Sequence, residues 1–143
     1  MATKDDAELH GKVLSCLLEG NQAWAANAPV LAIAVASLNF SRNGKPNAAA
    51  AHDLGLAAGN LSLEATERGL SVHQMIGILP DKAKVAFGIP EGHRPLTALA
   101  IGYAAPADSL PDPLKERDEA PRHRKRLDEF VYGEKFGEIS KLV

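Results

Sequence analysis

A cluster of basic side chains late in the sequence is the first candidate for chemistry. It comprises Arg117, Arg122, Arg124, Lys125 and Arg126. Guanidinium groups match phosphate oxygens two at a time, so this cluster could clamp a phosphate group. The alternative is a solvated charged segment balanced by the acidic residues among positions 116–119, and the residues by themselves favour this alternative.

Main-chain groups at Met75, Ile76 and Gly77 are the second candidate, because they follow a predicted strand. A glycine at such a place lets the backbone approach a flat ligand closely, although most glycines of this kind only serve a turn. The side chains of Trp24 and Tyr103 could stack on an aromatic ligand, but such residues more often belong to the core.

Side-chain catalysis has little support in the sequence. There is no Walker phosphate loop, no G-x-G-x-x-G after a strand, no H-E-x-x-H and no G-x-S-x-G. The five histidines lie singly, without the spacing of a metal-binding pair. Cys16 is the only cysteine, which excludes an intrachain disulfide and a cysteine zinc site. Its place beside Leu17 predicts an inert core residue.

The composition indicates one domain over residues 1–143. The chain is 45% hydrophobic and 24% charged, the profile of a folded globular domain. Its 16 Lys and Arg against 18 Asp and Glu give a net charge of −2, so neither nucleic acid nor an anionic membrane is expected as a partner. Nucleic-acid binding by residues 117–126 is disfavoured further because aromatic side chains are absent between the basic ones.

No targeting or membrane segment is predicted. Residues 1–6 are polar and acidic, unlike a signal peptide. The longest apolar stretch, residues 28–38, is about half of the ~20 residues that a membrane helix needs. We therefore expect a cytoplasmic protein.

Hydrophobic periodicity and turn residues predict the elements that position these candidates. Helices are expected at about 5–18, in a short piece through residue 24, at 48–68 and at 80–87. Strands are expected at 30–37, 71–75 and 96–103. A loop is expected at 39–46, a turn at 76–79, and an extended surface arm from 104 to 143. A helix between consecutive strands indicates an α+β or a three-layer α/β domain.

The helix expected at 48–68 carries apolar residues on two faces. One face holds Leu54, Leu61 and Ala65, and the other holds Leu56, Leu63 and Leu70. We therefore expect this helix to be buried nearly all round, and a second surface, such as another subunit, to cover part of it.

Six segments in a fixed order point to a known family. They are residues 24–29 before a strand, Asp53 with 55–63 in a long helix, 64–70, 73–77, 88–90 and 100–103. Together they span nearly the whole chain. In this order the sequence resembles the nitroreductase family of flavin oxidoreductases.

The resemblance implies an α+β fold, a three-layer sandwich in which helices, including a long central one, flank a small mixed sheet. It also implies an intertwined homodimer that binds FMN at its interface. The family's turn beside the reactive edge of the flavin falls on Met75, Ile76 and Gly77, whose N–H groups are expected to face N5 and O4. Its basic pair on the FMN phosphate falls on Arg124 and Arg126.

The implied chemistry is ping-pong hydride transfer: NAD(P)H reduces the flavin and leaves, and an electron-poor acceptor such as a nitroaromatic or quinone takes its place. No catalytic side chain is required, since the flavin carries the reaction. Family members begin with a further segment that holds an arginine-rich motif for FMN, and we expect this chain to start after it. The alternative function is therefore a dimer that binds flavin weakly or not at all and has a structural or ligand-binding role.

Overall fold

Four strands form one sheet in the computed structural model, which describes residues 1–143. The strands are β1 (Ala2–Thr3), β2 (Val30–Ser37), β3 (Ser71–Met75) and β4 (His93–Gly102). Their order across the sheet is β1-β2-β4-β3. The sheet belongs to the first of two structural units, Met1–Ala104, and the second unit is Ala105–Val143. Each unit is described by itself.

All neighbouring strands in the sheet are antiparallel, which corrects the expected mixed sheet. The mixed sheet was implied by the family resemblance, and a helix between consecutive strands is typical of a crossover between two strands of the same direction. β2 and β3 do run in the same direction, but β4 lies between them and pairs antiparallel with both. β2 and β3 are therefore parallel to each other but are not hydrogen-bonded neighbours in the sheet.

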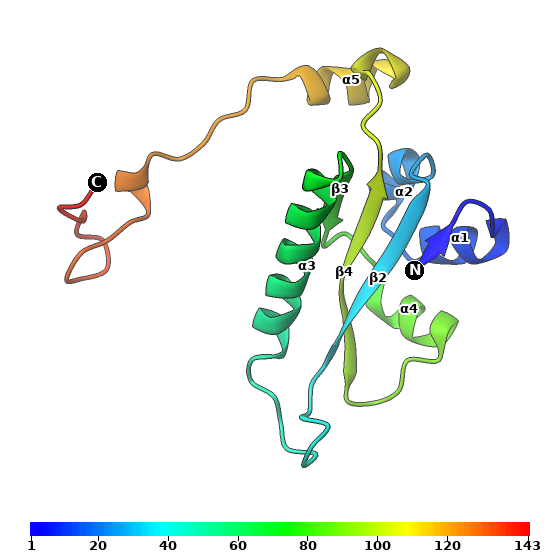
Figure 1. The fold of residues 1–143 in the computed structure, drawn as a ribbon, viewed down its shortest axis with the longest axis horizontal. Coiled ribbons are helices and arrows are strands. Elements are labelled where there is room, and N and C mark those ends of the chain that lie inside the picture. The colour runs from blue at the N-terminus through cyan, green and yellow to red at the C-terminus, as the bar shows by residue number, and fades with distance from the viewer. The chain divides into compact units, whose positions relative to one another are not determined.

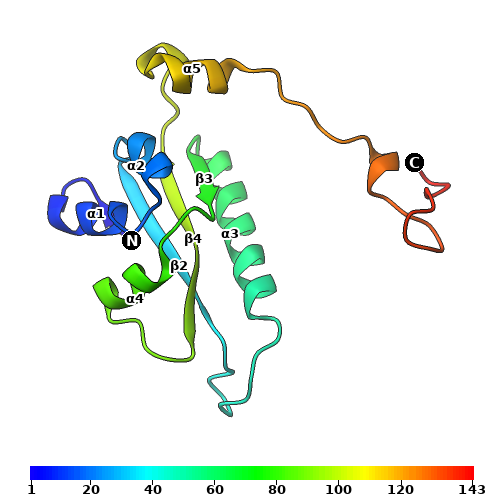
Figure 2. The ribbon, with the colours of Figure 1, turned by 180° about the vertical axis from the view of Figure 1, so that it is seen from behind.

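Helices cover both faces of the sheet. They are α1 (Ala7–Leu14), α2 (Glu19–Ala25), α3 (Ala50–Glu67) and α4 (Pro80–Phe87). α3 lies along one face, and α1, α2 and α4 lie on the other, as the two opposite views show (Figure 1, Figure 2). The expected α+β fold with three layers and a long helix is confirmed. No helix reaches the length and apolar character needed to cross a bilayer.

The side chains of the two central strands alternate between two cores. Ala98 and Ala100 of β4 join the core under α1, α2 and α4, whereas Leu99 joins the core under α3. The same alternation separates Leu31 from Ala32 in β2. Because successive strand residues point to opposite faces, this pattern is that of a sheet buried on both sides.

The first helix is shorter than the predicted span of 5–18. Asp6 rather than Thr3 caps it, since the Asp6 carboxylate accepts a hydrogen bond of 2.9 Å from the Leu9 N–H. Beyond Leu14 the chain turns, and Leu17 forms an antiparallel bridge with Ile78. This pairing competes with the helix for the main-chain groups of residues 16–18 and ends it early.

The long helix α3 is buried on one face only in the single chain, and the expected cover of its other face by a second surface stays a prediction. Ala58 and Ala65 are 6% exposed against the sheet, while Leu56 and Leu63 are 55% and 72% exposed on the outer side. The sheet of the same chain can cover only one face of a helix. Gly69, with φ of 73°, ends α3 in the left-handed conformation as the sequence predicts.

The second unit contains a helix where an extended arm was expected. This helix, α5, spans Asp112–Glu119, and short 3-10 turns occur at Ala107–Ser109 and Leu127–Glu129. Pro111 and Pro113 lie at its start, where no intrahelical N–H is required. Lys115 of α5 also forms an ion pair with Asp108.

Truncation of Leu17 tests the core on which the turn after β3 rests. Leu17 is fully buried between the end of α1 and Ile78, so Leu17→Ala is expected to lower the free energy of unfolding by about 2–5 kcal/mol. Val85→Ala on the exposed side of α4 should change it by less than about 0.5 kcal/mol. Urea denaturation at one protein concentration measures both, and equal losses would contradict this description of the core.

Candidate functional site

The turn between β3 and α4 brings together main-chain groups and exposed apolar side chains. Met75 ends β3 and is buried, whereas the Ile76 side chain is 88% exposed. Gly77 follows, and α4 begins at Pro80. The sequence-predicted turn at 76–79 and the predicted helix at 80–87 are thus both present.

Hydrogen bonds from neighbouring elements hold the carbonyl groups of this turn. The Thr97 hydroxyl on β4 donates to the Met75 carbonyl over 2.9 Å. The Gly77 carbonyl accepts two hydrogen bonds, one from the Leu18 N–H and one from Asn21 Nδ2, each of 2.9 Å. The Ile78 N–H donates to the Ile76 carbonyl over 2.9 Å. The Met75 and Gly77 carbonyls are therefore held by neighbouring elements, and the Ile76 carbonyl is held within the turn itself.

The N–H groups of Ile76 and Gly77 donate to no other group of the chain. No peptide bond is cis, so each N–H points away from the carbonyl of the preceding residue. Because hydrogen bonds hold the Met75 and Ile76 carbonyls, they also fix the directions of the unbonded Ile76 and Gly77 N–H groups. A pair of such fixed donors can bind acceptor atoms on the edge of a ligand.

Side chains beside these donors are apolar. Leu18 is 47% exposed, and its Cδ1 atom lies 3.5 Å from the position that a Cβ atom would take at residue 77. A Cβ there would also overlap Asn21 Nδ2, so only glycine fits without displacing Asn21. An apolar surface with two adjacent main-chain donors suits a flat ring that has acceptors along one edge.

The two aromatic candidates differ in their surroundings. Trp24 packs against the core of α1, α2 and α4, and its ring lies 4.5 Å from that of His73, centroid to centroid, at 54°. Tyr103 follows β4 directly and is 77% exposed. The core alternative for Trp24 is therefore correct, while Tyr103 remains available to a ligand.

Arg124 and Arg126 belong to the second unit, Ala105–Val143, and both are exposed. Arg126 Nε lies 3.1 Å and 3.3 Å from the two carboxylate oxygens of Asp128. Arg124 makes no ion pair, and its only hydrogen bond, of 3.4 Å, goes to the neighbouring His123 carbonyl. Of the predicted phosphate-binding pair, Arg124 is thus free, and Arg126 is partly engaged.

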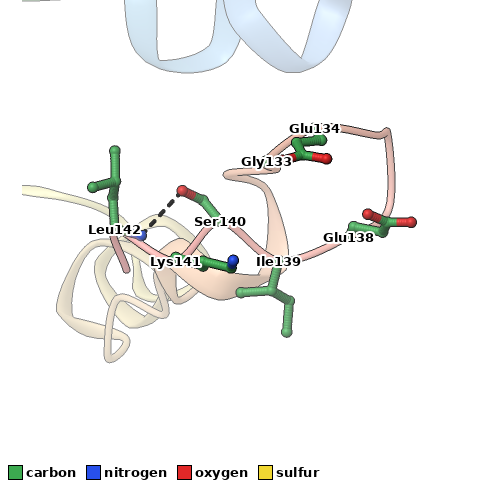
Figure 3. A pocket seen from close by; sticks show the side chains of 7 residues that line it. All are labelled: Gly133, Glu134, Glu138, Ile139, Ser140, Lys141 and Leu142. Atoms are coloured by element: carbon green, nitrogen blue, oxygen red, sulfur yellow. Dashed lines mark hydrogen bonds between the residues drawn. The ribbon is translucent and has the colours of Figure 1, made fainter.

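A hollow of about 430 Å³ in the second unit contains none of the predicted site residues. It is lined by Gly133, Glu134, Glu138, Ile139, Ser140, Lys141 and Leu142 (Figure 3). The hydrogen bond drawn within it, from the Leu142 N–H to the Ser140 hydroxyl, joins groups of the lining to each other. The hollow is therefore not part of the candidate site.

The buried titratable groups are explained by packing. Cys16 is fully buried, and its thiol donates to the Lys12 carbonyl over 3.4 Å, so the prediction of a core cysteine is confirmed. The buried ring of His10 is hydrogen-bonded through Nε2 to the Ala28 carbonyl at 2.9 Å. No three His, Cys, Asp or Glu side chains gather into a group that could hold a metal ion.

Residues 3–103 match the Nitroreductase family, and this stretch includes the sheet and the turn at 75–77. The chain belongs to the Nitroreductase family. The resemblance inferred from the six sequence segments is therefore confirmed.

Solved structures similar to this Nitroreductase family member include flavin proteins. One, an oxidoreductase containing FMN, is 33% identical with a TM-score of 0.84; the match covers 96% of this chain and 70% of the other. An FMN-dependent nitroreductase from Clostridium difficile is 19% identical with a TM-score of 0.62, covering 92% and 72%. An FMN and NADPH-dependent nitroreductase derived from Sphigopyxis sp. strain HMH is 20% identical with a TM-score of 0.56, covering 93% and 59%. The last two likenesses concern the fold alone.

A curated protein also matches part of this chain. It is an uncharacterised 15.4 kDa protein of the ask 5' region in Mycolicibacterium smegmatis, 35% identical over 88 residues. The match takes in 62% of this chain, and the chain spans 59% of that relative's length.

Sequence reasoning missed the residues that hold the turn, namely Leu18, Asn21 and Thr97. The available signal was weak: a short amide side chain near a helix start often bonds to main chain outside the helix. Which main chain it reaches, 56 residues away, depends on the tertiary fold.

Two glycine substitutions of opposite effect test the close contact at the turn. Gly77→Ala is expected to destabilise this Nitroreductase family protein by about 1–3 kcal/mol, because the added methyl group overlaps Asn21. Gly20→Ala on α2 meets nothing within 4 Å and should stabilise by up to about 1 kcal/mol. Thermal unfolding measures both, and a neutral Gly77→Ala would contradict the geometry of the turn.

Proposed function

We propose that this protein is an FMN-dependent NAD(P)H oxidoreductase that reduces nitroaromatic or quinone-like acceptors, with the flavin ring bound against Met75, Ile76 and Gly77. The observation that carries the proposal is the pair of N–H groups at Ile76 and Gly77, which have no partner in the chain, while the carbonyls of residues 75–77 each accept a hydrogen bond. The FMN in the oxidoreductase that is 33% identical over most of this chain supports it.

The groups at the turn fit the flavin ring chemically. N5 and O4 lie on one edge of the ring and accept hydrogen bonds, and two adjacent N–H donors complement that edge. The exposed apolar side chains of Leu18 and Ile76 complement the ring faces. Gly77 carries no side chain that would displace Asn21 and with it the donors of the turn.

Bound FMN supplies the hydride chemistry between NAD(P)H and the acceptor. The residues of the turn contribute donors that are already oriented, so no reorganisation is needed when the charge on the ring changes. The fold places no catalytic acid or base on residues 75–77, and none is required, because the protein's part is to bind and orient.

We assign the FMN phosphate to Arg124 and Arg126. Arg124 has a free guanidinium group, and Arg126 binds Asp128 through Nε alone, which leaves its terminal nitrogens. Guanidinium–phosphate contacts are charge-assisted and sensitive to salt when exposed.

We further propose a homodimer built on the outer face of α3. Leu56 and Leu63 lie two helical turns apart on this face, and both are exposed in the single chain. Gly59 lies between them, with nothing within 4 Å of its Cβ position. Two apolar side chains flanking a glycine allow a second α3 to approach closely.

Flavin binding tests the function directly. The full chain should take up one FMN per subunit, turn yellow, and oxidise NAD(P)H only when a nitroaromatic or quinone is present. Absorption after gel filtration and steady-state kinetics measure these properties. A chain that remains colourless in excess FMN would contradict the proposal and favour the cofactor-free dimer.

The same titration tests the arginine assignment. Arg124→Ala should weaken FMN about 10-fold or more, since one charge-assisted hydrogen bond is worth ~1.5–3 kcal/mol. Arg122→Ala removes a neighbouring exposed arginine without an assigned contact and serves as the matched control. Equal affinities for the two variants would remove Arg124 from the site.

A charge on the outer face of α3 tests the dimer. Leu63→Glu should convert the dimer to a monomer, because a buried unpaired carboxylate is strongly unfavourable at a subunit interface. Val85→Glu changes an equally exposed apolar residue on α4 and should leave the dimer intact. Sedimentation at micromolar concentration reports both; a wild-type monomer would contradict the assignment of this face.

A further inference from the structure

We infer that Asn21 is a positioning residue of the flavin site, which acts through the Gly77 carbonyl to orient the N–H groups of the turn. This inference rests on the proposed function and deepens it. Asn21 lies on α2, and its contact with the turn spans 56 positions of the sequence.

The hydrogen bond from Asn21 to the Gly77 carbonyl is the first of a short series of hydrogen bonds that sets the direction of the free Gly77 N–H. Asn21 Nδ2 and the Leu18 N–H both donate to the Gly77 carbonyl, so both lone pairs of that oxygen are engaged. This fixes the peptide plane that also carries the Ile78 N–H. The Ile78 N–H in turn donates to the Ile76 carbonyl, which sets the plane carrying the free Gly77 N–H.

The position of Asn21 is itself well determined. Its own N–H donates to the Leu18 carbonyl over 2.8 Å, so the same two residues that hold Gly77 are bonded to each other. Because the site at Gly77 has no room for a Cβ atom beside Asn21 Nδ2, the amide and the turn are in direct contact. A substitution at Asn21 is therefore expected to change the geometry of the turn at Gly77.

Gln22 provides a matched control on the same helix. Its side-chain amide also donates to a main-chain carbonyl outside α2, that of Leu17, over 2.7 Å. Asn21→Ala and Gln22→Ala each remove one partly buried side-chain amide and its hydrogen bond. The two variants should therefore lose similar thermal stability, a few degrees in melting temperature, and differ in what happens at the turn.

The experiment compares full-length wild type, Asn21→Ala, Asn21→Asp and Gln22→Ala. Asn21→Asp keeps the shape of the side chain but removes the Nδ2 donor. It replaces the alanine variant in the comparison if Asn21→Ala fails to fold. Both Asn21 variants should bind FMN about tenfold more weakly than Gln22→Ala, which equals ~1.4 kcal/mol. The visible absorption bands of bound FMN should shift only in the Asn21 variants.

A second readout needs no flavin. Hydrogen exchange of the Ile78 amide in the flavin-free protein should be faster in the Asn21 variants and unchanged in Gln22→Ala, because this amide closes the turn. Equal FMN affinity and equal Ile78 exchange in the Asn21 and Gln22 variants would overturn the role of Asn21 and leave the flavin proposal intact. A wild type that takes up no FMN would overturn both.

Discussion

The double hydrogen bond to the Gly77 carbonyl is the interaction on which the candidate site depends. It joins the start of α2 to the turn after β3, two segments that are far apart in the sequence. Each of the two bonds contributes about 1 kcal/mol net, so together they are a substantial part of the stability of a domain of this size. Their larger effect is geometric, since they fix the peptide plane of the Ile78 N–H, whose hydrogen bond to the Ile76 carbonyl sets the plane of the free Gly77 N–H.

The rest of the first unit provides a rigid support for this contact. Residues 16–18 and 77–79 run antiparallel, with the Leu79 N–H bonded to the Cys16 carbonyl at 2.7 Å and Leu17 bridged to Ile78. Alanines of β2 and β4 point into both cores and let the helices approach the sheet closely. A turn fixed to such a layer can present its donors without the mobility of an ordinary surface loop.

Local signals predicted most elements but not the contacts between them. The strand Val30–Ser37 and the helix Pro80–Phe87 have the predicted bounds, because an uncharged apolar run and a proline at a helix start are local features. The end of α1 depends on the pairing of Leu17 with Ile78, and the neighbours of β4 depend on the topology, so neither could be derived locally. For the site, Gly77 was a candidate because it follows a predicted strand, and the family resemblance added its role at the flavin. Asn21 is recognisable only when the fold brings it to the Gly77 carbonyl.

The proposed FMN chemistry would need few special side chains, because the cofactor carries the reaction, and this agrees with a sequence that contains no catalytic motif. The central claim is that the free Ile76 and Gly77 amides bind the edge of the flavin ring. A titration of the isotope-labelled full chain with FMN, followed by amide NMR, tests it most directly. We predict that the Ile76 and Gly77 amide signals show the largest shifts and become protected from exchange. Saturable FMN binding that leaves these two amides unchanged would contradict the account.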